Sequence, residues 1–552
     1  MIAIYIDNNS NSNLNTMITY IVEFTFVTLG YSYKIIYSLK GLNEFDVLIW
    51  YDSKGVKKEF IAQYAKKIPI VVVRYHENIY IPSQLKGNNL TTKIKKMKFY
   101  NEVIPIIHNN LFTDLVESVK DKDIALTVLN FDIFGNLYYH ITDCEFRAKK
   151  ADNGVIEQGS VFDEFYHEPI VNHMLAFTEK IIIGCCDKLD FPLIKKEYWP
   201  HGEDYAVIFS HTIDKLEKWG KGVFGEFLLD SVPLILKGKF ADFARNFTSG
   251  IKYFLTDEEQ YWNFENYLDL DEKYGIISTW FVSLLEDNGF IYNVEEKEVL
   301  VDELNKILNK GHELGLLVSP YEMDQIKMKT AYGKLAKITK EDQAGIRITG
   351  RPLNDKLSLA VHRNNLQYDC SIHSPNIDIF KNGNILPHHR LIDGIRTFPL
   401  EIPITFSDEI LKSSKYSYRS YESAKRKMDS LINKVVANGG LICFDFSISN
   451  FKDINYLEKL YTYTLDTIKE TNYYNNSCKN IALWWKARKN VLITNVEWGA
   501  NILFLDDFSF FTFKIHSKKK IKQVTMVDYQ IEDNIITMSN IKANNVVNIV
   551  LE

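Results

Sequence analysis

Apolar runs and amphipathic stretches alternate along most of this chain. Ala206–Ser210, Ile276–Phe281, Leu314–Val318 and Leu441–Phe446 are short apolar runs that predict buried parallel strands. Between them, stretches such as Tyr421–Asn438 carry apolar residues at helical spacing. Repeated strand-helix units predict a barrel-like or doubly wound α/β domain.

The pattern changes on both sides of this middle region. A smaller set of strands and helices precedes it, and short strands separated by turn residues follow it, which predicts an antiparallel sandwich. We therefore predict three domains: residues 1–195 as an amino-terminal α/β accessory domain, 196–478 as the barrel, and 479–552 as a β-sandwich. Within the barrel, Gly220–Glu258 is predicted to be a helical insertion that could lie over the strand ends as a lid.

Composition narrows the class of protein. The 552 residues are 46% hydrophobic and 25% charged, with a net charge of −6, so the chain is globular and has no basic surplus for nucleic acid or anionic membranes. Its six cysteines form no C-x-x-C pair, which favours reduced, buried thiols. No signal peptide and no apolar stretch of about 18 residues is visible, so we expect a cytoplasmic protein without a membrane span.

The strand Ala206–Ser210 leads into polar residues, which is typical of a strand that delivers side chains to a site at its carboxyl end. The surrounding motifs are Trp199-Pro200-His201-Gly202, then His211-Thr212-Ile213-Asp214, then Gly311-His312-Glu313-Leu314-Gly315-Leu316-Leu317. Together with Asp132-Ile133-Phe134 and Pro169-Ile170-Val171 upstream, they resemble the polysaccharide deacetylase family (NodB-like, carbohydrate esterase family 4), in its bacterial subset with an amino-terminal accessory domain.

The resemblance implies a fold and a chemistry. The fold would be a deformed (β/α) barrel of NodB type. The chemistry would be removal of an acetyl group from a polysaccharide or oligosaccharide in bacterial surface-glycan metabolism. A divalent metal, zinc if the protein is active, would be held by one Asp and two His, with a carboxylate as base and a late His as acid.

Most of the residues that this chemistry needs are replaced here. Asp214 stands at the metal carboxylate, but Thr212 stands where the base would be. Leu317 and Tyr321 stand where the two metal histidines would be, and the acid would lie near Ser447 in a segment without His. Because a catalytic zinc site needs about three protein ligands, the sequence predicts a degenerate metal site.

Two functions of different class remain open, together with a purely structural barrel. In the first, the protein binds or assembles glycans without hydrolysis, and aromatic residues such as Trp280 are available to stack on sugar rings. The polar groove would be lined by Thr212, Asp214, Ser319, Tyr321, Arg347 and Arg351. In the second, it is an active metal-dependent deacetylase with a rebuilt site. Candidate groups for that site are His211, His312, Glu313, His373, His388, His389 and Asp445.

If the protein is active, we expect Asp214, His211, Thr212 and Arg396 to act in catalysis, with Asp214 and in second place His312 as metal ligands. Each has a plainer interpretation. His211 and His312 could be hydrogen-bonded structural groups, His388 and His389 could be loop residues, and Arg396 could position a carboxylate. No cofactor is certain from the sequence.

Overall fold

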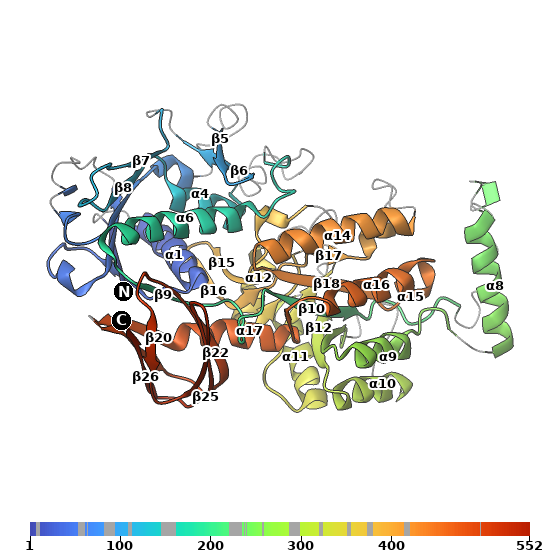
Figure 1. Cartoon of the computed structure of the whole chain (residues 1–552). Coiled ribbons are helices and arrows are strands. Elements are labelled where there is room, and N and C mark those ends of the chain that lie inside the picture. Colours follow the sequence, from blue (N-terminus) through green and yellow to red (C-terminus); the bar gives the residue numbers. More distant parts are fainter. Residues whose placement is uncertain are drawn as a thin grey trace.

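The structure of the chain, a computed structural model, is shown in Figure 1. It describes residues 1–6, 12–52, 61–62, 64–81, 94–108, 113–144, 162–219, 235–236, 238, 240–256, 259–285, 298–319, 324–349, 355–372, 379–412, 420–496 and 498–552. Their strands form four sheets and one two-stranded hairpin. Short 3-10 helices lie at Leu42–Glu44, Glu77–Tyr80, Asp187–Leu189, Lys381–Gly383 and Arg488–Asn490 (η7).

The first sheet has six strands in the order β2-β1-β3-β4-β8-β7. Their bounds are β1 Ile2–Ile6, β2 Tyr33–Ile36, β3 Val47–Asp52, β4 Ile70–Arg74, β7 Val116–Ser118 and β8 Leu126–Leu129. All neighbours pair in parallel except β7 and β8. Helices α1 (Ser12–Leu29), α4 (Ile133–Ile141) and α6 (Ile170–Cys186) share a core with this sheet, and the hairpin β5 (Ile94–Phe99) and β6 (Glu102–Ile107) packs beside α6.

The second sheet has ten strands and follows the order β15-β16-β14-β13-β12-β11-β10-β18-β17, with β19 also paired to β10. Their bounds are β10 Tyr205–Thr212, β11 Ser278–Val282, β12 Glu313–Val318, β13 Ile346–Ile348, β14 Tyr368–Asp369, β15 His388–Ile392, β16 Ile395–Glu401, β17 Phe406–Ser407, β18 Leu441–Ser447 and β19 Tyr473–Asn475. Only β15 and β16 pair antiparallel. The predicted α/β barrel is therefore confirmed in a coarser form, as a curled and mostly parallel sheet.

Helices cover the outside of this sheet (Figure 1). They are α9 Phe264–Tyr274, α10 Glu298–Asn309, α11 Gln325–Thr339, α12 Asp355–Arg363, α13 Glu409–Lys412, α14 Tyr421–Ala437, α15 Asn450–Asp453 and α16 Leu457–Lys469. Helix α17 (Cys478–Ala487) packs instead with the core inside the curled sheet. Several of these helices are capped by the side chain of the residue immediately before the helix. Ser420 accepts a bond from Ser423 N at α14, and Asp324 accepts from Ile326 N and Lys327 N at α11.

Alternation along β10 decides which of its side chains face the site. Ala206 and Ile208 belong to the core inside the curled sheet, whereas Val207 and Phe209 pack with the outer helices. Thr212 continues the inner series. His211 continues the outer series, against Tyr267 of α9 and Tyr461 of α16. Residues that pair in register on neighbouring parallel strands point to the same side of the sheet. The residues of the inner face can therefore be identified on each strand from the register.

Two four-stranded antiparallel sheets contain most of the residues after 490. The strands are β9 Leu193–Lys196, β20 Val491–Val496, β21 Gly499–Phe504, β22 Phe508–His516, β23 Ile521–Val524, β24 Asp528–Glu532, β25 Ile535–Ile541 and β26 Val546–Leu551. Their orders are β20-β21-β26-β23 and β24-β25-β22-β9. Because β9 precedes the barrel in the chain and pairs with β22, the regions interlock, and the predicted division into three domains stays a prediction.

A buried guanidinium joins three parts of the chain. Arg488 is 2% exposed and donates to the carbonyl oxygens of Val27 and Thr28 at the end of α1, and of Lys196 and Glu197 at β9. Gly30 allows this approach, because it has φ +88° and a Cβ there would lie 2.6 Å from Arg488 Nη2. These carbonyls are orphan acceptors at a helix end and a strand end, so one side chain satisfies several buried groups.

The insertion after β10 is helical in its described part, as α8 (Phe240–Thr256). Figure 1 shows α8 standing apart from the second sheet, at the right of the view, rather than lying over the strand ends as the predicted lid. In the described ranges, no helix is both long and apolar enough to cross a membrane.

Candidate functional site

The carboxyl end of β10 brings Asp214 against the end of β18. Asp214 accepts hydrogen bonds from Ser447 Oγ on Oδ1 and from Ser449 Oγ on Oδ2, the latter at 2.8 Å. Ser447 is brought there by the register of the two strands, in which Thr212 pairs with Ser447. Burial raises the pKa of Asp214 above its usual value, and the two serine hydroxyls offset part of this rise.

A guanidinium lies inside the curled sheet and contacts Thr212, two residues before Asp214. Arg347, on β13, is 2% exposed and donates from Nη1 to Asp445 Oδ1 at 2.5 Å and to Thr212 Oγ1 at 3.0 Å. Nη2 donates to Ser210 Oγ at 2.8 Å and Nε donates to the Cys370 carbonyl at 3.1 Å. Its plane lies over the Phe281 ring, 4.1 Å from the centroid.

Thr212 and Asp445 complete this inner network. Thr212 Oγ1 donates to Asp445 Oδ1 at 2.8 Å, and Ser407 Oγ donates to Asp445 Oδ2 at 3.2 Å. The threonine hydroxyl at the expected position of the base is therefore a hydrogen-bonding group that orients a carboxylate. Asp445, for which the sequence left the direction of the side chain open, points into the site.

A second buried carboxyl lies behind Ser447. Asp408 is fully buried and accepts from Ser447 N at 2.9 Å and from Asn450 Nδ2 at 2.8 Å. Burial first, and then the charges of Glu409 and Asp445, raise the pKa of Asp408 well above its usual value. Asp214 and Asp408 are therefore two carboxyls of raised pKa that share one serine as a neighbour. Such groups are candidates for holding a proton at a functional site.

The residues around Asp214 do not fit the family's metal. Both of its oxygens already accept serine hydroxyls, and Leu317, at the position of the first histidine, is 1% exposed and pairs in register with Arg347. Tyr321 lies outside the described residues. Among the described residues, the group of His, Cys, Asp and Glu side chains that could hold an ion does not include Asp214.

The two histidines next to the motif residues lie on the outer side of the sheet. His211 is fully buried, with its ring 4.4 Å from that of Trp280 and Nε2 3.4 Å from Asp271 Oδ2. His312 Nδ1 accepts from Ser278 N at 3.1 Å. Both are therefore packed away from Asp214, which agrees with their plainer interpretation as structural groups. Neither the catalytic role expected of His211 nor metal binding by His312 has geometric support here.

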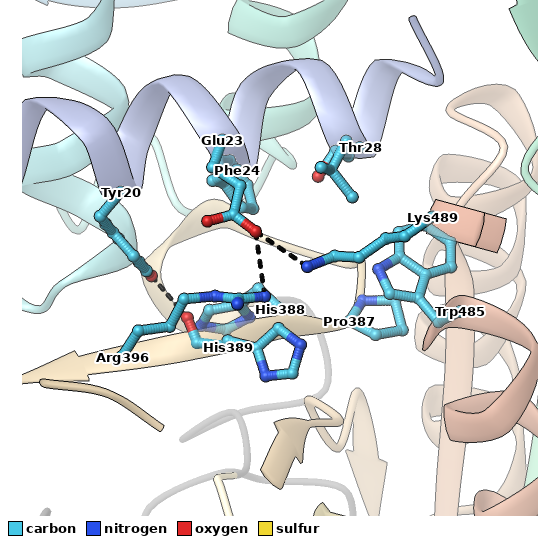
Figure 2. Close-up of a pocket in the computed structure, with 11 residues that line it drawn as sticks. Tyr20, Glu23, Phe24, Thr28, Pro387, His388, His389, Arg396, Trp485 and Lys489 are labelled. Atoms are coloured by element: carbon cyan, nitrogen blue, oxygen red, sulfur yellow. Dashed lines mark hydrogen bonds and ion pairs between the residues drawn. The ribbon is translucent and has the colours of Figure 1, made fainter. Parts of the chain in front are cut away.

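Arg396, His388 and His389 line another cavity, of about 30 Å³, shown in Figure 2. Arg396 Nη2 lies 3.3 Å from Glu23 Oε1 of α1, and Lys489 Nζ lies 2.8 Å from the same oxygen. Burial lowers the pKa of His388 to about 4 and that of His389 to about 2, so both rings are neutral at neutral pH. Arg396 is thus paired with Glu23 of α1, and the described residues show no contact between it and Asp214. Its catalytic role stays a prediction.

The residues expected to bind substrate divide into three groups. Arg347 is at the inner face, and Ser319 follows β12 and is half-buried. Trp280 is fully buried beneath the helices, with Nε1 donating to Ser278 Oγ at 3.0 Å, so its ring is not open to a sugar. Tyr321 and Arg351 lie outside the described residues, as does His373.

Sequence reasoning missed Ser449, Asp408 and Asn450, and it did not assign Ser447 to Asp214. Ser447 was visible as the residue in place of the acid histidine. The other three lie in segments after β17 and β18 that bring no motif with them, so only the folded structure could place them at Asp214.

No family model matches the chain, and no curated protein matches it. Solved structures match it over about half its length. They include polysaccharide deacetylases and members of carbohydrate esterase family 4. The family that the motifs resemble is thus represented among these structural neighbours.

Three of these structures illustrate the range of sequence identity and TM-score. A putative polysaccharide deacetylase from Mycobacterium smegmatis is 14% identical with a TM-score of 0.36, and the match covers 53% of this chain and 93% of that one. PuuE allantoinase is 14% identical with a TM-score of 0.37, over 53% and 93% of the two chains. A mutant of a carbohydrate esterase family 4 pseudoenzyme with restored enzymatic activity is 9% identical with a TM-score of 0.26, over 50% and 67%.

Proposed function

We propose that this protein is a polysaccharide-deacetylase-like protein that binds a glycan at the carboxyl end of its curled sheet and does not hydrolyse it. The observation that carries the proposal is the state of Asp214, whose two carboxylate oxygens accept hydrogen bonds from Ser447 and Ser449. A carboxylate satisfied in this way has lost the surroundings of a metal ligand and has gained those of a hydrogen-bonded structural or binding group.

Arg347 supports the same conclusion from the other side of the site. Its guanidinium supplies positive charge to Asp445, but it is a donor only, with a pKa that the Asp445 carboxylate keeps raised despite burial. Unlike a Lewis acid, it offers no open position at which a water could be ionised. The positive charge that pairs with Asp445 inside the sheet therefore comes from a guanidinium, which cannot activate a water for hydrolysis.

Hydroxyl, carboxylate and guanidinium groups are the kinds of group that bond sugar hydroxyls, which is why a binding role suits the residues present. The glycan class and the setting in bacterial surface-glycan metabolism follow from the resemblance and form part of this proposal. A cytoplasmic location likewise stays a prediction from the sequence.

The alternative is a metal-dependent deacetylase with a rebuilt site. Four of its candidates are His211, His312, His388 and His389, and in the described part of the chain none of them contacts Asp214. One observation favours some retained proton chemistry, namely the raised pKa values of Asp214 and Asp408.

The deciding experiment measures metal content, turnover and binding on one preparation. Acetate release and binding are measured with N-acetylated chito-oligosaccharides, for the wild type, for Asp214→Asn and for Asp269→Asn, an exposed aspartate of α9 that serves as a control. We expect no acetate release by any variant, and glycan binding that Asp214→Asn weakens and Asp269→Asn leaves unchanged. Turnover that is lost in Asp214→Asn alone would refute the proposal and establish the deacetylase.

A further inference from the structure

The amino-terminal end of α6 lies at a junction between the first sheet and the barrel. The β5–β6 hairpin packs against α6 on one side. On the other side, Lys434 of α14 lies 2.7 Å from Glu168 Oε1, just before α6 begins, and also donates to the His167 carbonyl at 2.6 Å. A cavity of about 530 Å³ opens at this junction, and its lining includes Glu102, His173, Lys180 and Asn438.

Three potential ligands converge beside this cavity. Glu102 begins β6, Glu168 precedes α6, and His173 stands in the first turns of α6. Each offers one ligand atom, and the three atoms lie within 4.8 Å of one another. In a tetrahedral site with bonds of about 2.0–2.1 Å, ligand atoms are roughly 3.3 Å apart, so small rotations of the two half-buried glutamates would close the geometry.

His173 brings to this group a buried ring nitrogen that has no hydrogen bond among the described residues. It is 5% exposed, and its Nδ1 is buried without any hydrogen bond in the described part of the chain. A buried ring nitrogen without a partner is costly, and a bound ion is one way to satisfy it. Burial lowers the pKa of His173. An imidazole binds a metal through the lone pair of a ring nitrogen.

The charges at the site fit a cation. Glu102 and Glu168 bring two negative charges to one neutral imidazole, and Lys434 balances one of them through Glu168. One nitrogen and two carboxylate oxygens form a borderline ligand set, which suits Zn²⁺ or Mn²⁺ better than the all-oxygen sites of Ca²⁺. Three protein ligands would leave at least one coordination position, on the side of the cavity.

We propose that Glu102, Glu168 and His173 form a binding site for a divalent transition-metal ion of the zinc class, separate from the inside of the curled sheet. The ion joins the β5–β6 hairpin to the start of α6. Because Glu168 also pairs with Lys434, it connects this junction to the barrel through α14. Its open position faces the cavity, where a water or a small oxygen ligand completes the coordination.

The test uses full-length, tag-free protein freed of metal with a chelator. Zn²⁺ is titrated in competition with a chromophoric chelator, for the wild type, His173→Gln, Glu102→Gln and the control His167→Gln, which removes an exposed imidazole next to the cluster. We expect one Zn²⁺ per chain. Loss of one ligand should weaken binding roughly a hundredfold or more, whereas His167→Gln leaves it unchanged. Circular dichroism verifies that each variant is folded, and the isosteric Glu102→Gln provides a second variant if His173→Gln fails to fold.

A structural readout gives the identity of the ligands. X-ray absorption at the zinc edge should show nitrogen and oxygen neighbours at about 2.0–2.2 Å and no sulfur, and an anomalous diffraction peak should lie between the three side chains. The proposal is overturned if Zn²⁺ binds equally to all variants, if none binds, or if binding is lost in Asp214→Asn and kept in His173→Gln.

Discussion

Replacing Arg347 by methionine removes the only positive charge that contacts Asp445 among the described residues, and we expect it to destabilise the protein strongly. The guanidinium is 2% exposed and donates to Asp445, Thr212, Ser210 and the Cys370 carbonyl. Removal of one partner from such a buried ion pair costs about 3–5 kcal/mol, because the remaining charge is left in a low-dielectric interior. Methionine keeps much of the apolar stem, so most of this cost is electrostatic.

A double-mutant cycle separates the pair from its surroundings. The free energy of unfolding is measured by urea denaturation at pH 7 for Arg347→Met, Asp445→Asn and the combined variant. We expect the combined variant to recover part of the loss, with a coupling energy of about 2 kcal/mol or more. The exposed pair Lys310–Glu272, measured in the same way, is the control and should show no measurable coupling. A coupling for Arg347 and Asp445 as small as in this control would refute the account of the inner network.

Three further predictions concern other buried groups. Burial raises the pKa of Asp132 to about 7, so the folded state keeps a proton that the unfolded state loses above about pH 4, and stability should fall from about pH 4 to pH 7. Asp132→Asn can still cap α4. Its free energy of unfolding, measured by urea titration, should therefore rise by about 2–3 kcal/mol relative to that of the wild type between pH 5 and pH 8. A difference between the two proteins that stays constant over this range would contradict the prediction. Ser449→Ala should lower the free energy of unfolding by about 1–2 kcal/mol, since it takes one donor from Asp214, and an unchanged urea midpoint would argue against that bond. In a His173→Gln background, the combined substitutions Thr212→Asp, Leu317→His and Tyr321→His should create zinc binding detectable by elemental analysis, and a failure to gain zinc would mean that Arg347 excludes it.

The residue pattern predicted β10, β11, β12 and β18 because these strands are continuous apolar runs and the helices near them are regular. The helix at Tyr421–Asn438 is observed as Tyr421–Ala437, and the strand at Leu441–Phe446 as Leu441–Ser447. The same pattern placed Thr212 and Asp214 at the carboxyl end of a strand, where Thr212 accepts from Arg347 and Asp214 accepts from Ser447 and Ser449. These features depend on local periodicity, which a sequence displays directly.

Errors arose where the sequence could not show which side of a strand is the inner one. Both faces of a buried parallel strand are apolar, so Ser278-Thr279-Trp280-Phe281 does not reveal that Trp280 points toward the helices. The register reveals it, because Trp280 pairs with His211 on the outer series. The surroundings of Arg396 could not be predicted for a different reason. It lies on the antiparallel hairpin of β15 and β16, whose partner is α1, more than 350 residues away in sequence.

The contacts of Arg488 also constrain how the chain is made. The carbonyls of Val27 and Thr28 at the end of α1 receive their donor from a residue 461 and 460 positions later. At ribosomal rates of about 5–20 residues per second, roughly 20–90 s pass between the synthesis of the two ends of this contact. During that interval the first sheet and α1 must persist with open acceptors and without β22, the partner of β9. We therefore expect the amino-terminal region of the nascent chain to be bound by chaperones. In a chain truncated before residue 488, the acceptors at the end of α1 should stay open.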